Sequence, residues 1–165
     1  MNIPQAKLLR LQFLARIVQK EIRYLGLTDQ RLFPVPFTRQ QVERLDEEIE
    51  LSERVDAFVS RFGRLQDTVG DKLLPQYLNA LGETTGPAID NLNRAEKIGL
   101  IHSAEIWLAL RDMRNQMVHE YMEDLDKRVN ALNKAHEYVD TLSNDAGKIL
   151  SDMASRGWVE LELER

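Results

Sequence analysis

The sequence contains no cysteine, few glycines and prolines, and no long apolar run. Without cysteine there is no disulfide framework, no thiolate metal site and no thiol nucleophile. Only 8 Gly and 5 Pro argue against a turn-rich β-sandwich or barrel, which needs a turn signal every 8–12 residues or so. The longest stretch without a charge, residues 73–82, is far shorter than the roughly 20 apolar residues that cross a bilayer. Because residues 1–10 also lack the pattern of a signal peptide, we expect a cytoplasmic protein with no membrane segment.

Metal and cofactor motifs are also missing. The three histidines, His102, His119 and His136, do not form a pair at metal-ligand spacing, and no glycine-rich phosphate loop follows a strand pattern. We therefore expect neither a metal nor a cofactor.

The 165 residues have the size of one domain, and 43% hydrophobic with 30% charged residues is a globular balance. The net charge of −5 is unevenly spread, because residues 1–39 carry +5 and the remainder −10. A uniformly basic nucleic-acid coat is therefore absent. We interpret the basic N-terminal segment as a solvated helix face, although a local basic binding face stays an alternative, and we find no cluster of aromatic and basic residues for stacking bases.

Apolar residues recur every three or four positions along most of the chain, which predicts helices. The first spans 5–25 and ends at Gly26, and LFPVPFT (32–38) is extended because of its two prolines. Thr38 and Gln41 predict a capping box that opens a long helical region up to about residue 81. Pro75 should bend this region, whereas Gly63 and Gly70 allow another helix to approach closely.

The second half predicts three further helices separated by short loops. GETTGP (82–87) is a loop, a short helix spans about 88–97, and another follows the N-cap Ser103 up to about 121. The last helix has an apolar stripe from Leu125 to Met153 and ends at Gly157. The tail WVELELER fits either a short strand or a disordered end. The fold class is thus all-α, an up-and-down bundle of four to five helices.

The helix over 104–121 contains an anomaly, because Arg114 falls in the middle of its apolar face on a helical wheel. Burying a guanidinium without a partner lowers the free energy of unfolding by several kcal/mol, as does removing one partner of a buried ion pair. Three arrangements avoid that cost: Arg114 pairs with a core acid such as Asp67 or Asp71, its head reaches water, or it lines a functional cleft. Arg111 either extends a phosphate site or pairs with Glu105 or Glu120.

Asn115 and His119 are four residues apart and share one edge of the same helix, about 140° round from Arg114 in the case of His119. An ideal helix therefore keeps Arg114 and His119 apart. Their heads meet only if the long arginine reaches round, if the helix end unwinds, or if a second subunit supplies the complementary residue.

Residues 114–121 read RNQMVHEY, which fits the pattern R-x4-H-x-Y. This pattern resembles the motif of HEPN-domain proteins, specifically the HepT-like ribonuclease toxins and relatives described as nucleotidyltransferase substrate-binding proteins. RLQDTVGDKLLP (64–75) is similar to the stretch that precedes the motif in such proteins. The resemblance covers about residues 40–150 and implies a single HEPN-like domain over 1–165, with a core at about 40–156 and a short tail at 157–165.

The resemblance implies the toxin of a HEPN/nucleotidyltransferase toxin–antitoxin pair, a metal-independent endoribonuclease whose active site forms at a homodimer interface. Arg114 would hold the phosphate of the RNA substrate, His119 would transfer protons, and Asn115 would orient either group. These residue types suit attack by the RNA's own 2′-hydroxyl, which needs proton transfer and positive charge on the phosphate. The acidic surface beyond the first helix weakens nonspecific attraction to RNA.

Tyr121 has a separate implied role. In HepT-like toxins the tyrosine of the motif accepts AMP from the partner nucleotidyltransferase, and the added charge and bulk would block the site. The alternative is a non-catalytic HEPN subunit that binds a nucleotidyltransferase and presents substrate or nucleotide. A third interpretation is a structural bundle in which Arg114, His119 and Tyr121 only satisfy core partners.

Overall fold

The computed structural model describes residues 3–118 and 124–162, and within these ranges all regular structure is helical. No helix in the described part of the chain is both long and apolar enough to span a membrane. The helical segments in chain order are α1 (Gln5–Leu32), α2 (Arg39–Glu43), the 3-10 turn η1 (Arg44–Asp46), α3 (Ile49–Asp67), the π-helical segment η2 (Thr68–Leu73), α4 (Leu74–Ala80), α5 (Ala88–Lys97), α6 (Ala104–Val118) and α7 (Leu125–Ser155).

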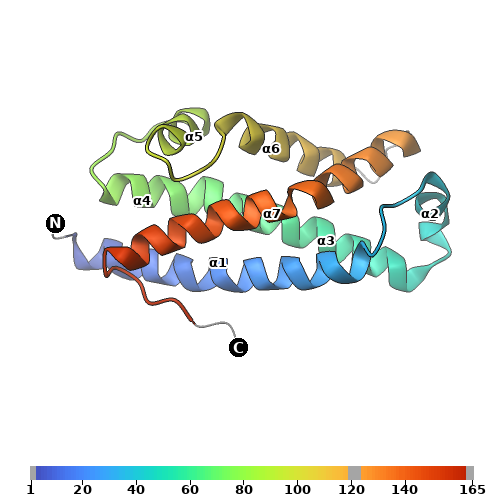
Figure 1. Cartoon of the computed structure of the whole chain (residues 1–165), viewed down its shortest axis with the longest axis horizontal. Coiled ribbons are helices and arrows are strands. Elements are labelled where there is room, and N and C mark those ends of the chain that lie inside the picture. Colours follow the sequence, from blue (N-terminus) through green and yellow to red (C-terminus); the bar gives the residue numbers. More distant parts are fainter. Residues whose placement is uncertain (1–2, 119–123, 163–165) are drawn as a thin grey trace.

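The long helices form an up-and-down bundle (Figure 1). α1 runs in one direction, α3 with η2 and α4 returns beside it, α6 runs parallel to α1, and α7 returns again. α3 contacts both α1 and α6, and α7 contacts the same two helices from the other side. The expected all-α class and the up-and-down order are therefore confirmed, but the described residues form more helices than the four to five expected, because the region after Thr38 is divided into α2, α3 and α4. A single continuous core lies between these helices, and Phe58, Phe62 and Tyr77 are its largest fully buried side chains.

α1 is longer than the sequence predicted, because it continues through Gly26 to Leu32. The expected end at Gly26 is wrong. Leu25, Thr28 and Leu32 are buried, so the inward-facing stripe extends past the glycine and packing maintains the helix there. The helix ends where Pro34 disfavours helical geometry at Phe33, whose ψ is 59°.

The predicted long helical region after Thr38 is interrupted once near its start. α2 and η1 form a short separate unit, and α3 begins only after Glu48. The expected capping box is confirmed, since the Thr38 hydroxyl accepts from the Gln41 amide and the Gln41 side chain accepts from the Thr38 amide. The interruption lets α2 pack against α7 while α3 packs against α1, which one straight helix would prevent.

Pro75 changes the helix register rather than ending the helix. A proline has no amide hydrogen and crowds the carbonyl four residues before it, here that of Asp71. The preceding residues form a π-helical turn in which the Leu74 amide donates to the Val69 carbonyl, five residues back. The bend expected at Pro75 therefore takes the form of the π-helical segment η2, at the level of Gly70.

The remaining boundaries agree closely with the sequence predictions. The Ser103 hydroxyl accepts from the Ile106 amide at 3.2 Å at the start of α6, and α5 covers the predicted range. Gly99 and Gly157 follow their helices with φ of +82° and +74°, which glycine adopts without steric cost.

The C-terminal tail forms no strand over its described residues 158–162 and lies against α1. Val159 is buried and Leu161 is partly buried against the core, whereas Glu160 and Glu162 are exposed. The Gln12 amide donates to the Trp158 carbonyl at 3.0 Å, and Gln19 exchanges two hydrogen bonds with the Glu162 backbone. The apolar residues of the alternating tail thus pack on the bundle, and the acidic residues between them face solvent.

Candidate functional site at the seam of α3 and α6

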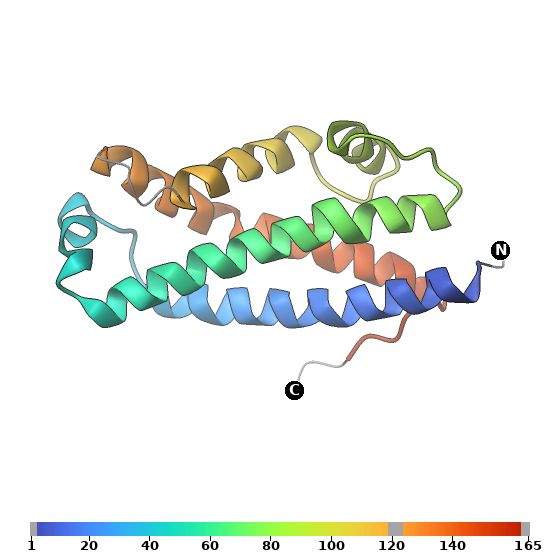
Figure 2. The same ribbon diagram turned by 180° about the vertical axis from the view of Figure 1, so that it is seen from behind.

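The buried face of α6 is the one predicted by its periodicity. Trp107, Leu110, Met113 and Met117 are buried and point towards the other helices, and Arg114 lies among them. Its side chain nevertheless remains 35% exposed, because it lies at the seam between α3 and α6 rather than in the centre of the bundle. Figure 2 shows this seam from the side where α3 separates α1 from α6.

Arg114 crosses α3 at Gly63 and pairs with Asp67. Its Nη1 lies 3.0 Å from each oxygen of the Asp67 carboxylate, whose side chain is 36% exposed. A Cβ atom at position 63 would lie 2.7 Å from Arg114 Nε, so the glycine provides the space through which the side chain passes. Of the arrangements left open by the sequence, pairing with Asp67 is the one observed, and both partners stay in contact with solvent.

Arg111 forms a second ion pair one turn earlier on α6. Its Nη2 lies 2.6 Å from Asp71 Oδ1, and both side chains are more than two-fifths exposed. Of the alternatives left open for Arg111, pairing with Glu105 is not observed, and Glu120 lies outside the described residues. Asp71 faces α6 from the π-helical segment, which brings it within reach although Glu105 is closer along the chain.

Below these ion pairs lies a buried polar contact that the sequence reasoning missed. The Trp107 indole donates to Asp145 Oδ2 at 2.8 Å, and the His102 amide donates to Asp145 Oδ1 at 3.3 Å. Asp145 is only 6% exposed, so this acid holds the start of α6 against α7. The sequence does indicate this contact, because Asp145 is an acid between Leu142 and Ala146 on the apolar stripe of α7.

The space at the seam is small. A hollow of about 10 Å³ is bordered by Gln66, Asp67, Asp71, Trp107 and Arg111. A volume of this size holds about one water molecule, so this hollow is too small for a nucleotide. Arg111 and Asp67 border it, whereas Arg114 does not.

The other motif residues are only partly placed by the structure. Asn115 is exposed on the turn of α6 that carries Arg114. His119 and Tyr121 lie outside the described residues, so the predicted approach of His119 to Arg114 and the surroundings of Tyr121 stay predictions. The structure brings Arg111 and Arg114 together along one seam, with an acid from α3 or η2 opposite each.

Glu21 is a second residue that the sequence reasoning missed. It lies between Val18 and Leu25 on the inward stripe of α1, and burial raises the pKa of its carboxyl group. One carboxylate oxygen accepts from the Thr68 hydroxyl at 3.0 Å, whereas the other is buried without a hydrogen-bond partner among the described residues. The charges of Arg64 and Lys72 oppose the pKa rise, and that of Asp67 adds to it.

Two further polar clusters fasten the ends of the bundle. At one end the Tyr77 hydroxyl donates to Asp152 and accepts from Arg156 Nε at 3.1 Å, and burial raises the pKa of Tyr77 above its usual range. At the other end His136 stacks on Phe33 and its Nδ1 lies 2.7 Å from Asp29. Both clusters join helices and lie apart from the motif.

No group of three or more metal-ligating side chains is assembled within residues 3–118 and 124–162. Comparison of the chain with protein-family models, with curated proteins and with solved structures gives no match in any of the three.

Proposed function

We propose that this chain is the toxin of a HEPN/nucleotidyltransferase toxin–antitoxin pair, acting as a metal-independent endoribonuclease in a homodimer. The observation that carries the proposal is the R-x4-H-x-Y pattern at 114–121, whose arginine replaces an apolar residue on the inward face of α6 and keeps 35% of its side chain exposed. A purely structural cation has no need of the histidine and tyrosine at these spacings.

The proposed reaction needs no metal ion. His119 takes the proton of a 2′-hydroxyl, the resulting oxygen attacks the adjacent phosphorus, and the 5′-oxygen leaves with a proton from water. Arg114 donates two hydrogen bonds to the phosphate and offsets its growing negative charge. Asn115 orients the phosphate or the imidazole from the same turn of α6.

The Asp67 pair is compatible with this role for Arg114. A partly exposed ion pair stabilises a protein by about 0–1 kcal/mol, so a phosphate that offers two oxygens competes with Asp67 for the guanidinium. In this proposal the second wall of the substrate site comes from the other subunit, because the hollow beside Asp67 and Arg111 is too small to hold a nucleotide.

In this proposal the partner nucleotidyltransferase inactivates the toxin through Tyr121. Transfer of AMP to the phenol oxygen adds a phosphodiester charge two residues after His119 and fills the space next to the phosphate site. Repulsion and occupation then exclude the RNA.

A second candidate is a non-catalytic HEPN subunit that binds a nucleotidyltransferase and presents substrate or nucleotide. The pairing of Arg111 with Asp71 and of Arg114 with Asp67 favours it, because both cations of the seam are already balanced by carboxylates of the same subunit.

Cleavage of RNA by the purified protein in the presence of EDTA distinguishes the two candidates. We expect Arg114→Ala and His119→Ala to lower the rate about 10²-fold or more, whereas Asp67→Asn keeps it because Asp67 only holds the arginine. His102→Ala, which changes an exposed histidine before α6, is the matched control. Equal rates for wild type and His119→Ala would contradict the ribonuclease proposal, and cleavage-inactive wild type that still binds a nucleotidyltransferase would favour the second candidate.

Labelling with AMP tests Tyr121. With the partner enzyme and ATP we expect the wild type and Tyr138→Phe to take up AMP, and Tyr121→Phe to take up none. Equal labelling of Tyr121→Phe would contradict this role.

A further inference from the structure

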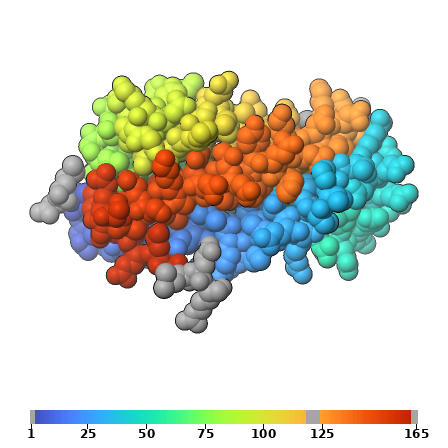
Figure 3. All heavy atoms as spheres, in the orientation of Figure 1, coloured from blue at the N-terminus to red at the C-terminus, as the bar shows by residue number. Residues whose placement is uncertain are grey.

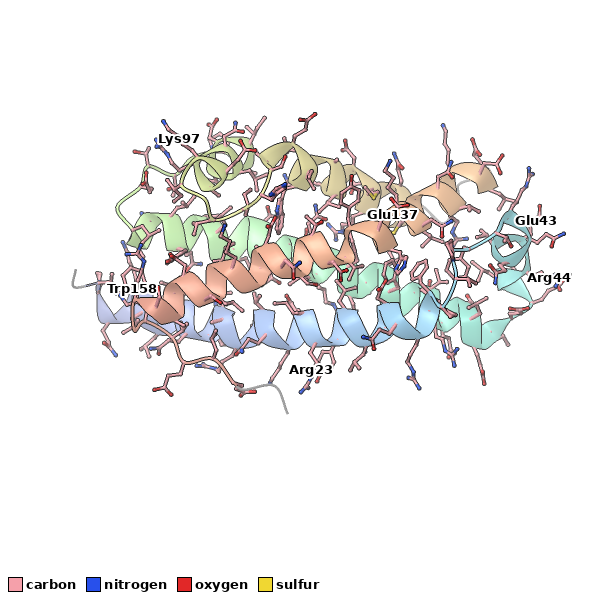
Figure 4. The ribbon with its side chains drawn as sticks, viewed as in Figure 1. Arg23, Glu43, Arg44, Lys97, Glu137 and Trp158 are labelled. Carbon is pink, nitrogen blue, oxygen red and sulfur yellow. The ribbon has the colours of Figure 1, made fainter. Side chains whose placement is uncertain are left out.

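We infer that the solvent face of α1 binds single-stranded nucleic acid, at a site separate from the motif on α6. We call this face the α1 surface and define it by Arg10, Phe13, Arg16, Lys20, Arg23 and Tyr24. α1 forms one long edge of the molecule that the other helices leave open (Figure 3). In Figure 4 the labelled Arg23 projects from α1 towards solvent.

The α1 surface carries positive charge only. Every exposed charged residue of α1 is a lysine or an arginine. The two acids of the helix, Glu21 and Asp29, are partly buried, where they contact Thr68 and His136. The uneven charge seen in the sequence is therefore concentrated on one solvent face of a single helix.

Two exposed aromatic rings lie in line on this face. Phe13 and Tyr24 are 44% and 41% exposed, and eleven residues correspond to about three helical turns, or about 16 Å along the axis. The guanidinium of Arg10 lies 5.4 Å from the Phe13 ring centre, and those of Arg23 and Arg61 lie 5.0 and 5.3 Å from the Tyr24 ring centre. The expectation that the chain lacks a cluster of aromatic and basic residues is thus wrong. Arg10 and Phe13 are three residues apart and Arg23 is next to Tyr24, so the helical period alone places them on one face, and only Arg61 comes from another helix.

A single strand matches this combination better than a lipid surface does. Phosphates are neutralised by lysine and arginine, and unpaired bases stack on aromatic rings and on guanidinium planes whatever their sequence. A membrane-binding helix keeps its cations at the margins of a continuous apolar face. Here Leu9 and Phe13 at one end of the line and Tyr24 and Leu27 at the other are also exposed. Arg16 and Lys20 lie between the two pairs, so charge interrupts the apolar positions.

The tail borders this surface with the opposite charge. It follows α1 from Gln12 to Gln19, and its exposed Glu160 and Glu162 lie along that edge. These carboxylates repel phosphates that approach Arg16 and thereby set an upper limit to the affinity of the α1 surface.

Fluorescence anisotropy with a labelled oligothymidylate tests the inference. This probe has no 2′-hydroxyl, so its binding is independent of the proposed ribonuclease activity. We expect Arg16→Gln/Lys20→Gln to weaken binding about tenfold or more and to reduce the salt slope, because two phosphate contacts are lost. Tyr24→Leu should weaken it about fivefold or more through lost stacking. Glu160→Gln/Glu162→Gln should strengthen it.

The matched control is Lys134→Gln/Lys148→Gln, which removes the same charge from exposed positions of α7. Since all these side chains are exposed, circular dichroism should show an unchanged thermal midpoint. Equal weakening by the α1 and α7 double variants would overturn the inference. Binding of a polyglutamate peptide without binding of the oligothymidylate would also overturn it and would identify an acidic protein as the partner.

Discussion

Glu21 shows how a single carboxyl group links burial to pH. Its pKa lies above the ordinary value of 4.5 chiefly because the side chain is partly removed from water, and one of its oxygens has no hydrogen-bond partner among the described residues. Charged Glu21 therefore opposes folding, whereas neutral Glu21 does not. The contribution of Glu21 to the free energy of unfolding is therefore fully present below about pH 4.5, the ordinary pKa that applies to the unfolded chain. It is lost as the pH rises through the raised pKa of the folded state.

We expect Glu21→Gln to raise the free energy of unfolding at pH 7, since glutamine keeps the Thr68 contact without a charge. The gain should be less than about 1 kcal/mol because the site is partly solvated, and it should disappear towards pH 4. Urea unfolding of both proteins across this pH range measures it. Glu53→Gln, at an exposed position of α3, is the control. A gain that persisted at acid pH would show that the charge is not its cause.

Gly63 is the residue that allows Arg114 to reach Asp67. A methyl group at this position would lie 2.7 Å from Arg114 Nε, so Gly63→Ala must displace the guanidinium. Alanine also improves helix propensity by about 1 kcal/mol, which offsets the loss of the ion pair. We therefore expect a free energy of unfolding within about 1 kcal/mol of wild type and a strong loss of RNA cleavage.

Gly147→Ala provides the comparison for this substitution, because a Cβ there meets nothing within 4 Å. It should stabilise α7 by about 0.5–1 kcal/mol and leave cleavage unchanged. If Gly63→Ala gained as much stability and kept full cleavage, the position of Arg114 would be irrelevant to function.

At the scale of the elements, the continuation of α1 past Gly26 is the clearest difference from the sequence prediction. Local propensity favours an end at a glycine, but two buried side chains beyond it, Thr28 and Leu32, hold the helix against the rest of the bundle. Gly26→Ala should thus stabilise the protein by about 0.5–1 kcal/mol, because the position is helical and open.

Gly99→Ala should have the opposite effect. Its φ of +82° is unfavourable for alanine by about 1 kcal/mol. Thermal unfolding of the two variants side by side measures the contrast. Destabilisation by Gly26→Ala would show that α1 ends where the sequence alone suggested.

At the scale of the whole molecule, the proposed ribonuclease depends on two subunits. We expect light scattering to give twice the 19.1 kDa of one chain. An active site formed across a two-fold axis makes a further prediction, since Arg114 of one subunit would act with His119 of the other.

Co-expression of Arg114→Ala with His119→Ala tests this arrangement. Each variant alone should be inactive, and the mixed dimer should recover cleavage because one of its two composite sites has both wild-type residues. If each site takes both residues from one subunit, mixing restores nothing. A strict monomer at micromolar concentration would contradict the dimer altogether.

Much of the fold follows from local features of the sequence. Apolar periodicity determined the existence of the helices, and the capping box at Thr38, Ser103 and the glycines after α5 and α7 determined most of their boundaries. The motif residues were also visible at this level, because a cation on an apolar helical face stands out against its neighbours. These features depend on residues within a few positions of one another.

The tertiary structure determined the features that depend on contacts between helices. It selected Asp67 for Arg114 and Asp71 for Arg111, because the antiparallel packing of α3 and α6 sets which carboxylate lies opposite which guanidinium. It also continued α1 through Gly26, buried Glu21, and brought Arg61 of α3 next to the Tyr24 ring of α1. Burial and long-range pairing depend on the distance between segments far apart in the chain, and local periodicity does not contain that distance.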